Sequence, residues 1–135
     1  MHGKEKVNIM IGYVTIGTND KKKAEKFYDE LFKEIGAKRI WETDKFTAYG
    51  VSRDKPSIII ASPHDGKPAT IGNGSMVALL VETPEKVTAV YNKAISLGAK
   101  DEGKPGPRGE GGFFAGYFRD LDGNKLNAFC MVNKK

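Results

Sequence analysis

The sequence predicts an α+β fold built from two tandem βαβββ modules, with mixed sheets curled into a cup and the helices outside. The first observation is an internal repeat of roughly 60 residues, in which Ile-Gly-Ala-Lys at 35–38 returns as Leu-Gly-Ala-Lys at 97–100. The second is that each tetrapeptide ends an amphipathic helical pattern. The third is that each helical pattern follows one strand-like run and precedes three shorter ones.

The first module opens with a strand over Val7–Gly17, which is rich in isoleucine and valine. Asn19 and Asp20 are both good N-cap residues for the helix that follows. Gly36 supplies the left-handed residue that ends this helix. The apolar stripe along the helix follows a period of 3.6 residues and consists of Ala24, Phe27, Tyr28, Leu31 and Ile35.

Three short strands are expected after this helix, over residues 39–42, 46–52 and 57–62. The turn-forming sequence Arg-Asp-Lys-Pro at 53–56 separates the last two and predicts a hairpin.

The second module repeats this order. A strand over Met76–Glu82 leads to Thr83 as N-cap and Pro84 at the first helical position. Gly98 ends the helix, and a weak strand near 100–103 precedes strands over 113–119 and 125–132. The turn at 120–124 joins these last two strands. The apolar stripe of this helix consists of Val87, Val90, Tyr91, Ala94 and Ile95.

Two segments interrupt the repeat. Residues 63–74 link the modules, and residues 103–112 hold five glycines and two prolines, which predicts a mobile or ligand-facing loop. We therefore expect a single domain over 1–135, with module 1 at about 7–62, the linker at 63–74 and module 2 at about 75–132.

Composition narrows the classes of function. The chain has 135 residues, 39% of them hydrophobic and 29% charged, as expected for a globular protein. The net charge of +5 is spread over the chain and accompanies no nucleic-acid-binding motif, so no nucleic-acid partner is predicted. The absence of a long apolar run predicts no membrane partner, and the lack of a signal-peptide pattern predicts a cytoplasmic protein. The one cysteine, Cys130, fits a reducing compartment and a buried core position.

The C-terminal run from Phe114 to Leu126 reads Phe-Ala-Gly-Tyr-Phe-Arg-Asp-Leu-Asp-Gly-Asn-Lys-Leu. It resembles the last hairpin of the vicinal oxygen chelate superfamily, which includes glyoxalases, bleomycin resistance proteins and extradiol dioxygenases; Leu121 replaces the usual proline. The opening strand at Tyr13 and the Phe27-Tyr28 pair on the following helix also resemble this superfamily. Residues 65–74 resemble the linker of a bacterial glyoxalase-like subgroup.

The resemblance implies a divalent metal held by His, Gln or Glu on the first and last strands of each module. In this sequence, those positions fall on Tyr13, Ile59, Met76 and Asn127. An alkyl chain cannot ligate, a neutral phenol and an amide are weak ligands, and a thioether suits Cu(I). We therefore predict no metal cofactor. His2 near the N-terminus and His64 in the linker do not replace the missing ligands.

Strand alternation then suggests which side chains face the cup. Trp41 is expected to close one edge of it, and residue 47 is a further candidate on its strand. No residue is assigned a catalytic role. The predicted ligand-binding residues are Tyr13, Thr15, Tyr49, Met76, Tyr117, Arg119 and Asn127.

Three functions remain open on this basis. The first is a protein that binds a small organic ligand without the superfamily's metal. The second is a metal-dependent lyase, isomerase or dioxygenase of the glyoxalase type, with an atypical ligand set. The third is a non-catalytic interaction module. The resemblance also implies a homodimer, with the pairing of modules within or between chains left open.

Overall fold

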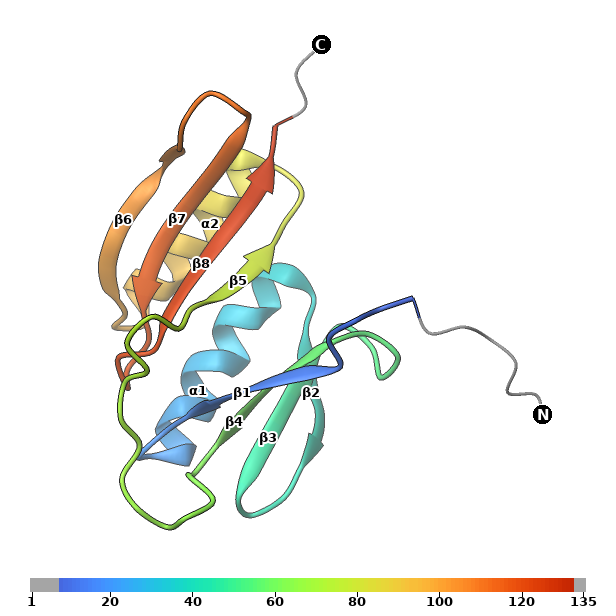
Figure 1. The fold of residues 1–135 in the computed structure, drawn as a ribbon, viewed down its shortest axis with the longest axis vertical. Helices are drawn as coiled ribbons and strands as arrows, with labels where there is room; N and C mark the ends of the chain where they lie inside the picture. The colour runs from blue at the N-terminus through green and yellow to red at the C-terminus, as the bar shows by residue number, and fades with distance from the viewer. Residues whose placement is uncertain (1–7, 133–135) are drawn as a thin grey trace, which may run out of the picture.

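The computed structural model describes residues 8–132 and confirms the predicted α+β class with two βαβββ modules (Figure 1). His2 and Val7 lie outside the described residues. The first module consists of β1 (Tyr13–Gly17), α1 (Lys21–Leu31), the 3-10 turn η1 (Phe32–Ile35), β2 (Lys38–Glu42), β3 (Phe46–Gly50) and β4 (Ser57–Ala61). The second consists of β5 (Val77–Leu80), α2 (Pro84–Ser96), β6 (Lys100–Pro107), β7 (Phe113–Arg119) and β8 (Lys125–Met131).

Each module forms its own four-stranded mixed sheet. The strand order is β1-β4-β3-β2 in the first, here called sheet A, and β5-β8-β7-β6 in the second, here called sheet B. In both, the first strand runs parallel to the last and the other pairs are antiparallel. Among residues 8–132 no strand pairing joins the two sheets, so they do not close into a continuous cup.

The helices begin and end where the capping residues predict. Asp20 accepts a hydrogen bond from the Lys23 backbone N–H, and Thr83 accepts one from the Lys86 N–H. Gly36 ends the first helical segment at φ 73°, and Gly98 follows the second at φ 106°, conformations that glycine adopts at least cost.

The two helices cover one face of each sheet and pack against one another. Figure 1 shows α2 behind sheet B, with α1 extending from sheet A toward it. A single core of buried side chains joins both helices and both sheets, and its largest members are Tyr28, Tyr49, Phe32, Phe118, Leu31 and Ile60. The opposite face of each sheet is left open, and these two surfaces are called the open faces of sheets A and B below.

Polar contacts fix the position of one module against the other. The Tyr28 hydroxyl on α1 donates to Asp120 Oδ2 at 2.6 Å, in the turn between β7 and β8. The Thr18 hydroxyl donates to Asp122 in the same turn at 2.6 Å, and Asn124 Nδ2 donates to the Gly17 carbonyl at 2.9 Å. The turn that carries the most specific sequence motif therefore also holds the modules together.

Two strand predictions are corrected by the structure. The opening strand begins at Tyr13, whereas the sequence placed its start near residue 7. The sequence predicted a loop over 103–112, but the first half of this segment belongs to β6, which extends to Pro107. This strand lies at the edge of sheet B, where prolines are tolerated because one side of the strand needs no ladder hydrogen bond. Within residues 8–132, no helix is long and apolar enough to cross a membrane.

Candidate functional site

The open face of sheet A forms a shallow aromatic groove of about 590 Å³. Four residues in register cross it from β1 to β2: Thr15, Ile59, Ala48 and Trp41. Trp41 is 62% exposed and Tyr13 is 63% exposed, which are high values for such large aromatic side chains. Since exposed apolar surface is costly in water, this face is suited to covering by a ligand or a partner.

The rim of this groove is basic. Arg53 and Lys55, from the turn between β3 and β4, line it together with Ser57, and no acidic side chain is among the lining residues. The groove therefore combines an aromatic floor with positive charge at one end.

The open face of sheet B is also aromatic. Phe113 and Phe129 stack with ring centroids 5.4 Å apart, and Tyr117 lies further along β7 on the same face. Leu80 on β5 is 71% exposed. Both modules thus present an apolar sheet face that their own helices do not cover.

Two cations lie over the ring of Tyr117. The Arg108 guanidinium carbon is 5.4 Å from the ring centroid, and Lys125 Nζ is 5.5 Å from it. Arg108 follows β6 and Lys125 opens β8, so the two groups approach β7 from the strands that flank it. Arg119, which sequence alternation placed near this face, forms an ion pair with Glu102 at 3.4 Å.

Asn127 lies next to this cluster, directly opposite Tyr117 in the β7–β8 ladder. It is 1% exposed, and its Oδ1 accepts no hydrogen bond from the described residues. A buried acceptor without a donor is rare in folded proteins because its hydration is lost without replacement. A group of a bound ligand is a natural donor for this atom.

The implied metal positions do not hold a metal-binding set. Tyr13 and Ile59 lie on the open face of sheet A, and Asn127 lies on that of sheet B, with Met76 just before β5. Together they offer a phenol, an alkyl chain, a thioether and an amide. Among residues 8–132, no three His, Cys, Asp or Glu side chains are grouped so as to hold a metal ion. The residues present therefore do not fit the divalent metal of the superfamily.

The prediction that Tyr49 and Thr47 face the ligand is wrong by one residue in register. Both side chains lie under α1, where Tyr49 donates to Asp29 Oδ1 at 2.9 Å and Thr47 donates to Glu25. Burial and the hydrogen bond to Asp29 raise the pKa of Tyr49, so it stays a neutral donor. Phe46 and Ala48 occupy the open face instead.

Asp29 belongs to the same helix-side network. Its burial is outweighed by hydrogen bonds from Arg39 and Tyr49, and the pKa of its carboxyl is lowered. Arg39 holds it through two bonds of 2.9 and 2.8 Å. These groups neutralise one another and stabilise the packing of α1 on sheet A, so they are poor candidates for chemistry.

A smaller cavity of about 260 Å³ lies between β1 and the segment before β5. Thr15, Met76 and Lys125 line it together, so the structure brings two of the predicted residues to one place. His64 lines another groove with Thr15 at the end of sheet A, as a rim position in the linker would allow. In the described part of the chain, His64 belongs to no group of His, Cys, Asp or Glu side chains that could hold a metal ion.

Cys130 is 1% exposed on the helix side of β8, in agreement with its predicted core position. Burial raises the pKa of its thiol, which disfavours the nucleophilic thiolate.

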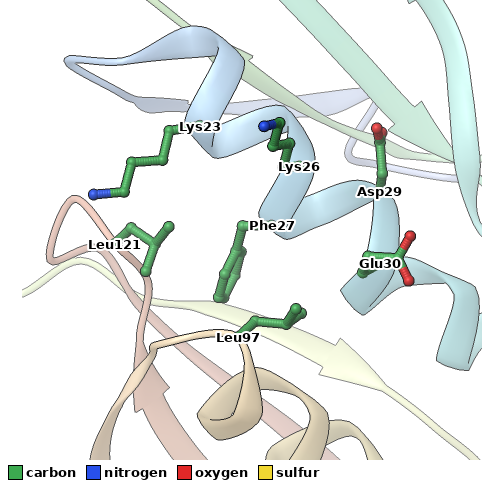
Figure 2. Close-up of a pocket in the computed structure, with 7 residues that line it drawn as sticks. All are labelled: Lys23, Lys26, Phe27, Asp29, Glu30, Leu97 and Leu121. Atoms are coloured by element: carbon green, nitrogen blue, oxygen red, sulfur yellow. The ribbon is translucent and has the colours of Figure 1, made fainter.

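A further groove of about 500 Å³ lies on the helix side, between α1 and the second module (Figure 2). Phe27, Leu97 and Leu121 form its apolar floor, and Lys23 and Lys26 stand on its α1 side. It contains both signs of charge, and its acidic members are paired: Asp29 with Arg39, and Glu30 with Lys33. We interpret it as the seam between the modules, not as a ligand site.

Sequence reasoning missed Arg108 as a site residue. The signal available was the glycine-rich composition of residues 103–112, which indicated a ligand-facing segment without indicating which side chain faces the ligand. It also missed the basic rim at Arg53 and Lys55, because turn residues show no periodicity.

Comparisons with known proteins agree with this architecture. A model of the Glyoxalase/Bleomycin resistance protein/Dioxygenase superfamily matches residues 10–128. A glyoxalase/bleomycin resistance protein from Albidiferax ferrireducens T118 is 32% identical, with a TM-score of 0.82, and the match covers 90% of this chain and 98% of that one. A search of the curated proteins finds no match.

Two more distant structures share the fold. A glyoxalase/bleomycin resistance protein/dioxygenase family enzyme from Burkholderia phytofirmans is 20% identical, with a TM-score of 0.71 and coverage of 90% and 98%. The fosfomycin resistance protein FosX from Listeria monocytogenes is 17% identical, with a TM-score of 0.68 and coverage of 93% and 96%.

Proposed function

Because the chain belongs to the glyoxalase/bleomycin resistance protein/dioxygenase superfamily, we propose that it binds a small organic ligand on its open sheet faces, without the superfamily's metal. One observation carries the proposal. The positions that would ligate a metal are Tyr13, Ile59, Met76 and Asn127, and they lie among aromatic and apolar side chains. Such a lining, with a few polar groups, is typical of small-molecule sites.

The proposal includes a homodimer. Each chain would supply two half-sites, because among residues 8–132 no strand pairing joins the two sheets into one enclosure. Covering both open faces with a second protomer would remove a large apolar area from water, at about 25 cal/mol per Å². The exposed apolar side chains available on or beside these faces are Tyr13, Trp41, Met76, Leu80 and Met131.

The test is metal binding by calorimetric titration with Ni²⁺, Zn²⁺ and Mn²⁺, together with the metal content of untagged protein purified without chelator. We expect no stoichiometric site. The double variant Met76→His/Asn127→Glu is the positive control, because it restores an imidazole and a carboxylate at two positions of the implied ligand set. A tight site of about one metal per chain in the unaltered protein would contradict the proposal and favour a metal-dependent lyase, isomerase or dioxygenase.

A further inference from the structure

We propose that the ligand is an organic anion, and that Arg108 and Lys125 hold its acidic group above the Tyr117 ring on the open face of sheet B. This inference rests on the proposed function and adds the chemical class of the ligand. Its starting point is the convergence of two cations within 5.5 Å of one ring centroid.

Backbone carbonyls fix the Arg108 side chain in place. Its Nη2 donates to the Lys104 carbonyl at 2.7 Å, and its Nη1 donates to the carbonyls of Gly106 and Pro107 at 2.9 and 3.3 Å. These bonds use at most three of the five N–H groups of the guanidinium, so donors remain for a ligand. A cation held before the ligand arrives loses little conformational freedom on binding.

The glycines of β6 make room for this arrangement. A Cβ atom at Gly103 would lie 3.2 Å from the Tyr117 ring and 3.3 Å from Arg108 Nη2. A Cβ at Gly106 would lie 3.4 Å from Arg108 Nη1. Because the glycines of this strand lack a Cβ atom, the Arg108 guanidinium can lie close to the strand beside the Tyr117 ring.

Among residues 8–132, the two cations have no acidic partner. Neither Arg108 nor Lys125 forms an ion pair there, whereas Arg119 is paired with Glu102 and Arg39 with Asp29. Two unpaired cations near one ring create a local excess of positive charge, which favours the binding of an anion. Guanidinium groups bind carboxylate and phosphate oxygens with matched geometry.

Asn127 indicates that a ligand at this place carries a hydrogen-bond donor apart from its acidic group. Its buried Oδ1 accepts no hydrogen bond in the described part of the chain, and the residue lies directly across the ladder from Tyr117, so a hydroxyl or N–H group of the ligand would fit there. The stacked Phe113 and Phe129 rings continue the same face and suit an apolar body attached to the acidic group. The two cations indicate the acidic group and the stacked rings the apolar body, so the class is an apolar or aromatic carboxylate or phosphate monoester.

The experiment compares three naphthalene probes by calorimetric titration of the full chain: 2-naphthoate, 2-naphthyl phosphate and the neutral isostere 2-naphthamide. We expect at least one anion to bind about tenfold or more tightly than the amide, as a charge-assisted hydrogen bond allows. The comparison between the two anions tells whether a carboxylate or a phosphate is preferred.

Arg108→Gln and Lys125→Gln should each weaken binding of the preferred anion about tenfold and leave 2-naphthamide binding unchanged. Lys104→Gln is the matched control, since Lys104 lies on β6 shortly before Arg108, its side chain is 78% exposed and it pairs with Asp101 at 3.3 Å. The control should bind both probes as the unaltered chain does. Denaturant midpoints establish that all three variants are folded.

Equal binding of anions and amide, or equal losses in Lys104→Gln and Arg108→Gln, would overturn the inference while leaving the proposed function in place. If none of the three probes binds, both the proposed ligand site and the inference fail. Amide binding that survives while anion binding is lost in the two variants would support both.

Discussion

A single side chain, Asn127, shows how function and stability diverge at this site. Its Oδ1 is buried and accepts no hydrogen bond from residues 8–132, which costs about 1–3 kcal/mol relative to a satisfied acceptor. Thr47 is equally buried in sheet A, but its hydroxyl donates to the Glu25 carboxylate. The two residues therefore form a matched pair for testing whether Asn127 contributes to stability as Thr47 does or is available to a ligand.

We predict that Asn127→Leu leaves the free energy of unfolding unchanged or raises it by about 1 kcal/mol, because an unpaired polar group is replaced by an apolar one of similar size. Thr47→Val should lower it by about 1–3 kcal/mol, since Glu25 loses a donor. Urea unfolding of both variants measures the difference. A loss in Asn127→Leu as large as that in Thr47→Val would show that Asn127 is structural.

At the scale of elements, matching strand positions of the two modules carry side chains of different size. The row across sheet A pairs Ala48 on β3 with Trp41 on β2, and the matching row in sheet B pairs Tyr117 on β7 with Gly103 on β6. The large ring stands on the edge strand in one module and on the inner strand in the other. Each choice leaves space beside the ring, and in sheet B Arg108 occupies that space.

The helices show the same divergence. Tyr28 and Tyr91 occupy matching positions, and both hydroxyls donate to an aspartate. The partner of Tyr28 is Asp120, which lies in the other module, whereas the partner of Tyr91 is Asp101 in its own module. Burial, followed by the charge of Asp120, raises the pKa of Tyr28, so its hydroxyl stays protonated as a donor.

We predict that Tyr28→Phe lowers the free energy of unfolding by about 1.5–3 kcal/mol, because a buried hydrogen bond to a charged group is lost. Tyr91→Phe is the control and should cost about 1 kcal/mol or less, since Asp101 is exposed and keeps other partners. Thermal and urea unfolding compare the two. Equal costs would mean that the contact between modules adds nothing beyond an ordinary hydrogen bond.

At the scale of the whole molecule, the two open faces are the surfaces through which we expect the chain to associate. Their aromatic side chains are not covered by the helices α1 and α2, and within residues 8–132 the edge strands β1 and β5 have no partner on their outer sides. Apolar surface and free strand edges together favour association.

We therefore predict a particle of about twice 14.8 kDa by light scattering after size-exclusion chromatography. Leu80→Lys, at a position 71% exposed on β5, should shift the protein toward the monomer, since it introduces charge on an open face. Val51→Lys changes an exposed apolar residue in the turn after β3 and should leave the dimer intact. A monomer at all concentrations would contradict the proposed assembly and leave the half-sites open.

Local patterns in the sequence determined the elements of this protein. The helix ends are fixed by backbone conformation and by hydrogen bonds to nearby residues, so they can be predicted without knowledge of the fold. The residues concerned are Asp20, Thr83, Pro84, Gly36 and Gly98. The repeat of these signals was enough to predict two βαβββ modules, and the buried positions of Tyr28 and Tyr91 followed from helical periodicity.

Only the tertiary structure decided the details of the candidate site. The register of β3 depends on its ladders with β2 and β4, and it places Tyr49 under α1, where alternation alone allowed either face. The approach of Arg108 and Lys125 to Tyr117 joins residues from β7, β8 and the segment after β6, and no local pattern records such a meeting. That no donor among residues 8–132 reaches Asn127 Oδ1 is likewise decided by the tertiary structure, because a buried group is satisfied by groups close in space and not by spacing along the chain.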